Sequence, residues 1–186
     1  MASRLPLGPT HQVGVGIVLF HPNDPTQLLV VQEKTGPAAA IGLWKMPTGL
    51  LDPNEDVPVA AQRELLEETG IGSVSFRGIL CFKQSHSESR MSSDLFFVCQ
   101  LEFQDKGTID TTSTLWKPQE EEIAAIRWMS VEDYCNQERW LGSPVYETMN
   151  DCIRRASRYE IQHQHQHEDI SHLSSETAPD LSLIHI

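Results

Sequence analysis

The sequence predicts an α+β fold, arranged as an α/β/α sandwich in which helices flank a central mixed β-sheet. Strand-like segments come first, a helix follows, further strands come next, and a second helix closes the pattern. This order is typical of a sheet with helices packed on it. Hydrophobic residues make up 39% of the 186 residues, so the chain can bury a core, and its length fits one domain with tails.

The expected strands are short apolar runs bounded by turn residues. The first two, 13–20 and 27–34, flank the cluster HPNDPT, and this arrangement predicts a hairpin. A loop is expected over 35–42. The remaining expected strands are 43–47, 73–82, 94–103 and 123–129, with polar loops over 83–93 and 108–122.

The first helix is expected within residues 57–69, which are rich in helix formers. Pro58 is tolerated in a first turn, and Asn54 or Asp56 is available as the N-cap. Gly70 stands where a left-handed residue would end the helix. The sequence therefore predicts a helix with both of its boundaries marked.

The second helix is expected over 143–159, where apolar residues recur at helical spacing. The composition then turns polar and repetitive, which predicts a disordered tail over 160–186. The closing LSLIHI is apolar and unlike its surroundings, and we interpret it as a non-native extension. With residues 1–10 as a flexible lead-in, the folded domain is expected to span 11–159.

The formal net charge of −12 disfavours two classes of partner. Duplex nucleic acid and anionic membranes both reward basic surfaces, so neither is expected here. No apolar run approaches the ~20 residues of a membrane span. The four cysteines form no CxxC pair and are interpreted as reduced thiols, which predicts a cytoplasmic protein.

The stretch GLLDPNEDVPVAAQRELLEETGI, residues 49–71, gathers like charge on one helix. At 100° per residue, Glu64, Glu67 and Glu68 share an arc of about 100°. Such carboxylates repel each other, and the dipole disfavours them near a helix C-terminus. A hard divalent cation, Mg²⁺ or Mn²⁺, would remove the conflict and leave positions open for phosphates. A solvated acidic helix face is the alternative.

The spacing within this stretch resembles the Nudix box: Gly49, five residues, Glu55, seven residues, then REL, Leu66, EE, Thr69, Gly70 and Ile71. The resemblance implies a Nudix fold. It also implies roles for the matching residues. These are metal binding and catalysis by Glu64, Glu67 and Glu68, metal binding by the Thr48 carbonyl, and structural roles for Gly49, Glu55, Arg63 and Gly70.

The resemblance further implies hydrolysis of a nucleoside diphosphate linked to another moiety, with Mg²⁺ or Mn²⁺ as cofactor and Glu64 as a candidate base. Many members add a carboxylate from outside the box. Glu122, adjacent to Ile123, matches that position in QEEEI, although an acidic surface run is the alternative. We therefore expect Glu122→Gln to impair turnover more than Glu120→Gln.

Segments outside the box, among them LLVVQEKTG, GLWKMPTGLL and SDLFFVCQL, resemble plant cytosolic Nudix hydrolases of ADP-ribose and NADH. They also resemble the antisense-fibroblast-growth-factor Nudix proteins, and both groups carry a further N-terminal domain. ADP-ribose and NADH are thus the expected substrates, and a homodimer is left open. His86, Arg90 and Lys83 are candidate substrate-binding residues, with plain solvation as the alternative.

Two functions of other classes stay open beside the enzyme. One is a catalytically silent Nudix-fold sensor of ADP-ribose or NAD-type ligands, which would not need all four glutamates of the box. The other is an acidic partner-binding protein with no ligand pocket. Coenzyme A, prenyl diphosphates and oxidised nucleotides also remain as substrates that the sequence does not distinguish.

Overall fold

The computed structural model of the chain describes residues 11–87, 92–104, 116 and 121–174, with side chains described as far as Gln164. The expected lead-in 1–10 and the final residues 175–186 lie outside this range, as does Arg90.

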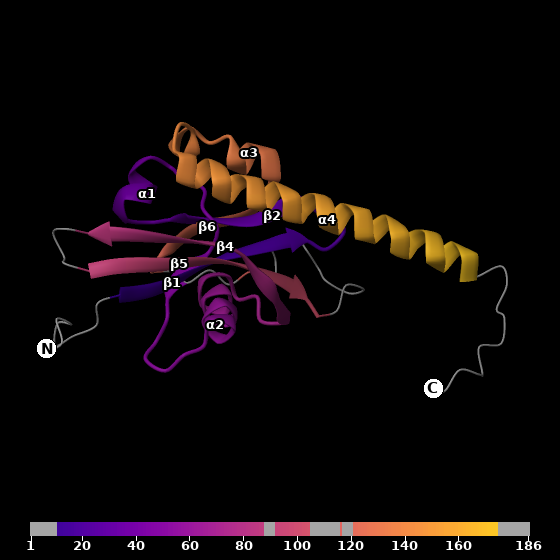
Figure 1. The fold of residues 1–186 in the computed structure, drawn as a ribbon, viewed down its shortest axis with the longest axis horizontal. Helices are drawn as coiled ribbons and strands as arrows, with labels where there is room; N and C mark the ends of the chain where they lie inside the picture. The colour runs from indigo at the N-terminus through magenta and orange to yellow at the C-terminus, as the bar shows by residue number, and fades with distance from the viewer. Residues whose placement is uncertain (1–10, 88–91, 105–115, 117–120, 175–186) are drawn as a thin grey trace, which may run out of the picture.

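A six-stranded sheet forms the centre of the fold, and Figure 1 shows it between two helical layers. Its strands follow the order β4-β5-β1-β2-β6, and β3 pairs with β1. β1 runs parallel to β5 and antiparallel to β2 and β3, while β2–β6 and β4–β5 are antiparallel. The sheet is therefore mixed, as the sequence predicts. The strands are β1 (His11–His21), β2 (Asp24–Glu33), β3 (Thr48–Leu50), β4 (Val74–Ser87), β5 (Ser92–Phe103) and β6 (Ile123–Ser130).

β1 lies in the middle of the sheet, and its side chains alternate between two cores because successive residues of a strand point to opposite faces. Val15, Ile17 and Leu19 belong to the core that also contains residues of α2 (Val57–Thr69). Val18 and Phe20 belong to the core that also contains residues of α3 (Val131–Cys135) and α4 (Pro144–Ser174). Both faces of the central strand are therefore buried.

α2 covers one face of the sheet and turns Ala60, Ala61 and Leu65 toward it. Gly70 ends the helix with φ +78°, a left-handed conformation that favours glycine, and its N–H donates to the Leu66 carbonyl. Asp56 occupies the N-cap position, but its side chain makes no capping hydrogen bond. Both helix boundaries thus agree with the sequence-based prediction.

α3 (Val131–Cys135), the 3₁₀ turn η2 (Glu138–Trp140) and α4 (Pro144–Ser174) cover the opposite face. In Figure 1, α3 and α4 lie above the sheet and α2 lies below it. The α/β/α sandwich is confirmed. α3 and η2 were not expected, because five-residue and three-residue elements are too short to show a hydrophobic period.

Three expected segments differ in detail. The expected polar loop 83–93 is largely strand, because β4 continues to Ser87 and β5 begins at Ser92. The loop 35–42 contains a short helix, α1 (Gly36–Ala40). In 43–47, only Lys45 pairs as a strand, through a single bridge to Val31, and the regular strand β3 begins at Thr48. Pro47 lacks a backbone N–H, so it interrupts a regular ladder there.

The end of the chain also differs from the expected boundary at residue 159. α4 continues to Ser174, and its side chains bond the sheet region beyond that boundary. Gln100 Nε2 donates to Glu160 Oε1 at 2.8 Å, and Gln164 Nε2 donates to the Pro22 carbonyl at 2.7 Å. Polar composition suggested a tail, whereas these residues extend an amphipathic helix whose partners are distant in sequence.

None of the helices in the described ranges is both long enough and apolar enough to cross a membrane.

Candidate active site

Arg63 ties the loop that precedes α2 to the helix itself. Its Nε and Nη2 donate to the two carboxylate oxygens of Glu55, each at 2.8 Å, and Nη2 also donates to the Leu50 carbonyl at 2.9 Å. Nη1 donates to Glu64 at 2.8 Å and to Glu67 at 3.0 Å. One guanidinium therefore holds three glutamates of the box through charge-assisted hydrogen bonds.

Glu55 is held in its ionised form. Its hydrogen bonds with Arg63 lower the pKa of the carboxyl from 4.5 to about 2, and the backbone N–H of Asp52 contributes through a 2.9 Å bond. The same contacts raise the pKa of the Arg63 guanidinium. The loop and the helix thus meet through two groups that stay charged at neutral pH.

Glu64 lies directly against Gly49. A Cβ atom at Gly49 would stand 1.8 Å from Glu64 Cδ, so only glycine leaves room for this carboxylate. Burial raises the pKa of the Glu64 carboxyl, while Arg63 opposes the rise. The first glycine of the box is therefore required by close approach rather than by backbone angle.

Glu68 is the most buried of the three helix carboxylates, with 5% of its surface exposed. Its Oε2 accepts from the Thr48 N–H at 3.2 Å. Burial raises the pKa of the Glu68 carboxyl to about 7, and the positive charge of Lys45 and the Thr48 N–H oppose that rise. Glu67, by contrast, has half of its side chain exposed. The structure thus places the Thr48 backbone beside the Glu68 carboxylate.

The donor set fits a hard divalent cation. Glu64, Glu67 and Glu68 offer carboxylate oxygens, the ligands that Mg²⁺ and Mn²⁺ prefer. Arg63 Nη1 already bridges Glu64 and Glu67, so a cationic group is bound between two of the three. As they stand, no three His, Cys, Asp or Glu side chains in the described part of the chain converge on one point. Metal binding by all three carboxylates would therefore require Glu64 and Glu67 to release Arg63.

A cavity of about 140 Å³ opens beside Thr48. Aromatic side chains from β5, η2 and α4 form much of its wall, and Lys45 and Lys83 supply positive charge. The Lys83 Nζ lies 5.3 Å from the ring centres of both Phe96 and Tyr146. Its cationic head is therefore held over two aromatic faces. The cavity is lined by Leu43, Lys45, Met46, Thr48, Lys83, Phe96, Tyr134, Trp140, Tyr146, Met149 and Asn150.

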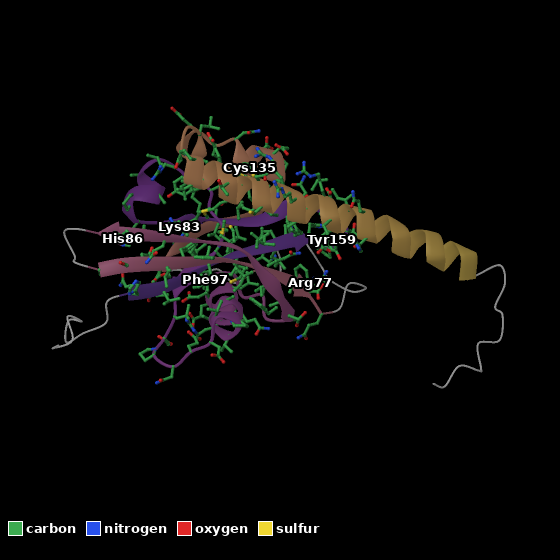
Figure 2. All side chains as sticks on the ribbon, viewed as in Figure 1. Arg77, Lys83, His86, Phe97, Cys135 and Tyr159 are labelled. Atoms are coloured by element: carbon green, nitrogen blue, oxygen red, sulfur yellow. The ribbon has the colours of Figure 1, made fainter. Side chains whose placement is uncertain are left out.

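His86, another candidate substrate residue, does not line this cavity. Figure 2 shows Lys83 and His86 on the same strand, with His86 nearer to its end. His86 is exposed, and its Nδ1 lies 2.8 Å from Ser93 Oγ. Trp44 packs against the core, with the Arg127 guanidinium 4.0 Å from its ring centre. Of these positions, only Lys83 lines the cavity.

Glu122 lies at an exposed turn before β6, where its carbonyl accepts from the Lys34 N–H at 2.8 Å. Its carboxylate makes no hydrogen bond or ion pair with the described residues. Sequence reasoning missed another carboxylate, Glu33, which ends β2 and adds to the raised pKa of Glu68. No local signal distinguishes Glu33, since its relation to Glu68 arises from sheet pairing.

The fold and the box together point to one family, and a sequence model of the NUDIX domain matches residues 10–152. The chain belongs to the Nudix family. The predicted resemblance is therefore confirmed, and the match covers all six strands and the first turns of α4.

Curated Nudix proteins are similar over most of this chain. Nudix hydrolase 2 of Arabidopsis thaliana is 41% identical over 133 residues, which are 72% of this chain and 44% of that protein. The human nucleoside diphosphate-linked moiety X motif 6 is 35% identical over 138 residues, which are 73% and 40%. The chain thus spans less than half the length of each of these relatives.

Solved Nudix structures share the fold. The MutT protein from Methanosarcina mazei Go1 aligns with a TM-score of 0.56 and 20% identity, covering 83% of this chain and 99% of that one. At this identity the likeness establishes the architecture of the Nudix domain and nothing finer.

Proposed function

We propose that this Nudix chain is a metal-dependent hydrolase that cleaves the pyrophosphate bond of nucleoside diphosphate-X compounds. The observation that carries the proposal is the assembly of Glu64, Glu67 and Glu68 around Arg63, Gly49 and Thr48. Gathering three carboxylates at one helix face opposes local electrostatics, so a cation-dependent role accounts for it better than a structural one. The names of the relatives, Nudix hydrolases and nucleoside diphosphate-linked moiety X proteins, support the same reaction.

Glu64, Glu67 and Glu68 are the proposed metal ligands, together with the Thr48 carbonyl. Mg²⁺ or Mn²⁺ held there would neutralise the diphosphate charge and make the attacking water more acidic. Glu64 is the proposed base that takes the proton of the attacking water. Glu122 stays a proposal for the carboxylate outside the box, to be judged by comparing Glu122→Gln with Glu120→Gln.

ADP-ribose and NADH are the proposed substrates. The support is the sequence similarity to the plant proteins and a cavity beside Thr48 with aromatic walls for a ring and Lys83 for a phosphate. At about 140 Å³, the cavity is below the range of roughly 300–1,000 Å³ that encloses a drug-sized ligand, so it would hold only one part of such a substrate. His86 and Arg90 remain proposed contacts for the rest of the molecule.

A panel of nucleotide conjugates tests the proposal. ADP-ribose, NADH, coenzyme A, a prenyl diphosphate and an oxidised nucleotide are incubated with Mg²⁺ or Mn²⁺, and products are separated by chromatography. We expect AMP from ADP-ribose or NADH, loss of activity with a chelator, and recovery on adding metal. Hydrolysis that survives excess chelator would contradict the mechanism.

A catalytically silent Nudix sensor is the second candidate, and an equilibrium-binding measurement beside the turnover assay separates the two. Binding of ADP-ribose with Mg²⁺ and no AMP formed would favour the sensor. We also propose a reducing, cytoplasmic location, supported by four cysteines that all stand as free thiols. A homodimer remains open, and sedimentation would decide it.

A further inference from the structure

Lys45 is held by two groups that come from separate parts of the chain. Its Nζ lies 2.5 Å from Glu33 Oε1, at the end of β2, and donates to Thr48 Oγ1 at 2.7 Å. The backbone of Lys45 is fixed as well, through paired hydrogen bonds of 2.8 and 3.0 Å with Val31. Its side chain is 16% exposed. The ammonium therefore occupies a defined position rather than sampling solvent.

This ammonium has a donor to spare. A lysine side chain carries three N–H groups, and Glu33 and Thr48 account for two of them. Among the described residues, no third acceptor bonds to it. Lys45 also lines the cavity of about 140 Å³. N–H groups of a lysine that is largely shielded from water usually have hydrogen-bond partners. The third N–H of Lys45 is therefore available to a ligand in that cavity.

Thr48 connects this lysine to the carboxylates of the box. Its hydroxyl accepts from Lys45, while its backbone N–H donates to Glu68. The positive charge of Lys45 is close enough to favour the ionised form of Glu68. An anion that extends from the cavity to the box carboxylates would therefore lie next to the Lys45 ammonium.

We propose that Lys45 is a phosphate-binding residue for the diphosphate substrate, and that Glu33 is the positioning residue that holds its ammonium. The inference rests on the proposed function for the choice of a diphosphate as the anion. The competing explanation is a structural ion pair that fastens the loop 43–47 to the end of β2.

Binding of α,β-methylene ADP tests the inference, because its carbon bridge replaces the oxygen that hydrolysis would cleave. Affinity is measured by calorimetry with saturating Mg²⁺, and Mn²⁺ affinity is measured separately by electron paramagnetic resonance. The variants are Lys45→Met and the double change Glu33→Gln with Lys45→Met. Lys45→Met alone leaves the Glu33 carboxylate without its ion-pair partner, which can prevent folding. The double variant removes both charges and therefore avoids this problem. Lys34→Met, at the exposed position next to Glu33, is the matched control.

We expect both Lys45 variants to bind the analogue roughly tenfold or more weakly, the size of a lost charge-assisted hydrogen bond. Lys34→Met should bind the analogue within about twofold of the wild type. Mn²⁺ affinity should not change in the double variant, which removes one positive and one negative charge that act in opposite directions on Glu68. Wild-type affinity for the analogue in the double variant, or a parallel loss of its Mn²⁺ affinity, would overturn the inference. Analogue binding through Lys45 without turnover of any panel compound would contradict the proposed function alone. Turnover that is unaltered in the double variant would contradict the inference alone.

Discussion

Arg63 and Glu55 form a two-point ion pair, with both N–H···O distances at 2.8 Å, that joins the loop before α2 to the helix. The remaining Arg63 nitrogen reaches Glu64 and Glu67. The residue that positions the loop is thus also the residue that keeps the acidic helix face together before any cation binds.

Glu55→Gln should lower the free energy of unfolding by about 1 kcal/mol at neutral pH. The substitution weakens a charge-assisted ion pair. The expected loss of stability is at the low end for such pairs, because about a quarter of the Arg63 side chain is exposed and solvent screens its charge. Urea unfolding measures the change. Asp52→Asn is the control, since Asp52 is 74% exposed and 4.0 Å from Arg63 Nε, and its effect should be smaller.

The same variant predicts a pH dependence. The folded-state pKa of Glu55 is about 2, below its ordinary value of 4.5. Its contribution to stability is therefore complete above pH 4.5 and is lost as the pH falls toward 2. The stability difference between wild type and Glu55→Gln should shrink over that window in unfolding curves. A difference that stays constant from neutral pH to pH 2 would mean that the ion pair does not stabilise the fold.

Gly49→Ala should reduce metal binding and turnover without lowering the stability of the fold. The new methyl group would overlap the Glu64 carboxylate, which is the flexible end of a side chain and can move away. We expect a clear loss of Mn²⁺ affinity and turnover, with a melting temperature close to that of the wild type. Gly78→Ala is the control, because a Cβ there would meet nothing within 4 Å. If Gly49→Ala retained full metal affinity, the placement of Glu64 would not matter for the site.

Glu67→Gln and Glu68→Gln should each reduce Mn²⁺ affinity and turnover by roughly 10- to 100-fold or more, since each removes a proposed ligand charge. Glu132→Gln removes a carboxylate from α3, where its partner is Arg154 at 3.0 Å, and it should change neither quantity. Electron paramagnetic resonance of Mn²⁺ and product chromatography report the two effects. Unchanged values in folded Glu68→Gln protein would contradict the proposed site.

Removing residues 160–186 should destabilise the domain relative to the full chain. The deletion removes the bonds of Glu160 with Gln100 and of Gln164 with the Pro22 carbonyl. Two lost hydrogen bonds correspond to about 1–3 kcal/mol in the free energy of unfolding. Chemical unfolding of the truncated protein and of the full chain makes the comparison. Equal stability would show that α4 beyond residue 159 does not contribute to the fold.

The sequence by itself determined all of the strands except β3, together with the boundaries of α2 and the membership of Glu64, Glu67 and Glu68 in one face. These properties depend on spacings of a few residues, where periodicity and capping act directly. Gly49, Glu55 and Arg63 could be named for the same reason, since the box carries them at fixed intervals.

The tertiary structure alone decided which residues stand beside that face. Glu33 and Lys45 meet because β2 pairs with the segment around Lys45, and Lys83 reaches Tyr146 because α4 packs over the sheet. The helical continuation past residue 159 likewise depends on contacts with Gln100 and Pro22. Such contacts join residues that are distant along the chain, and strand order and helix packing set them, so no local pattern encodes them.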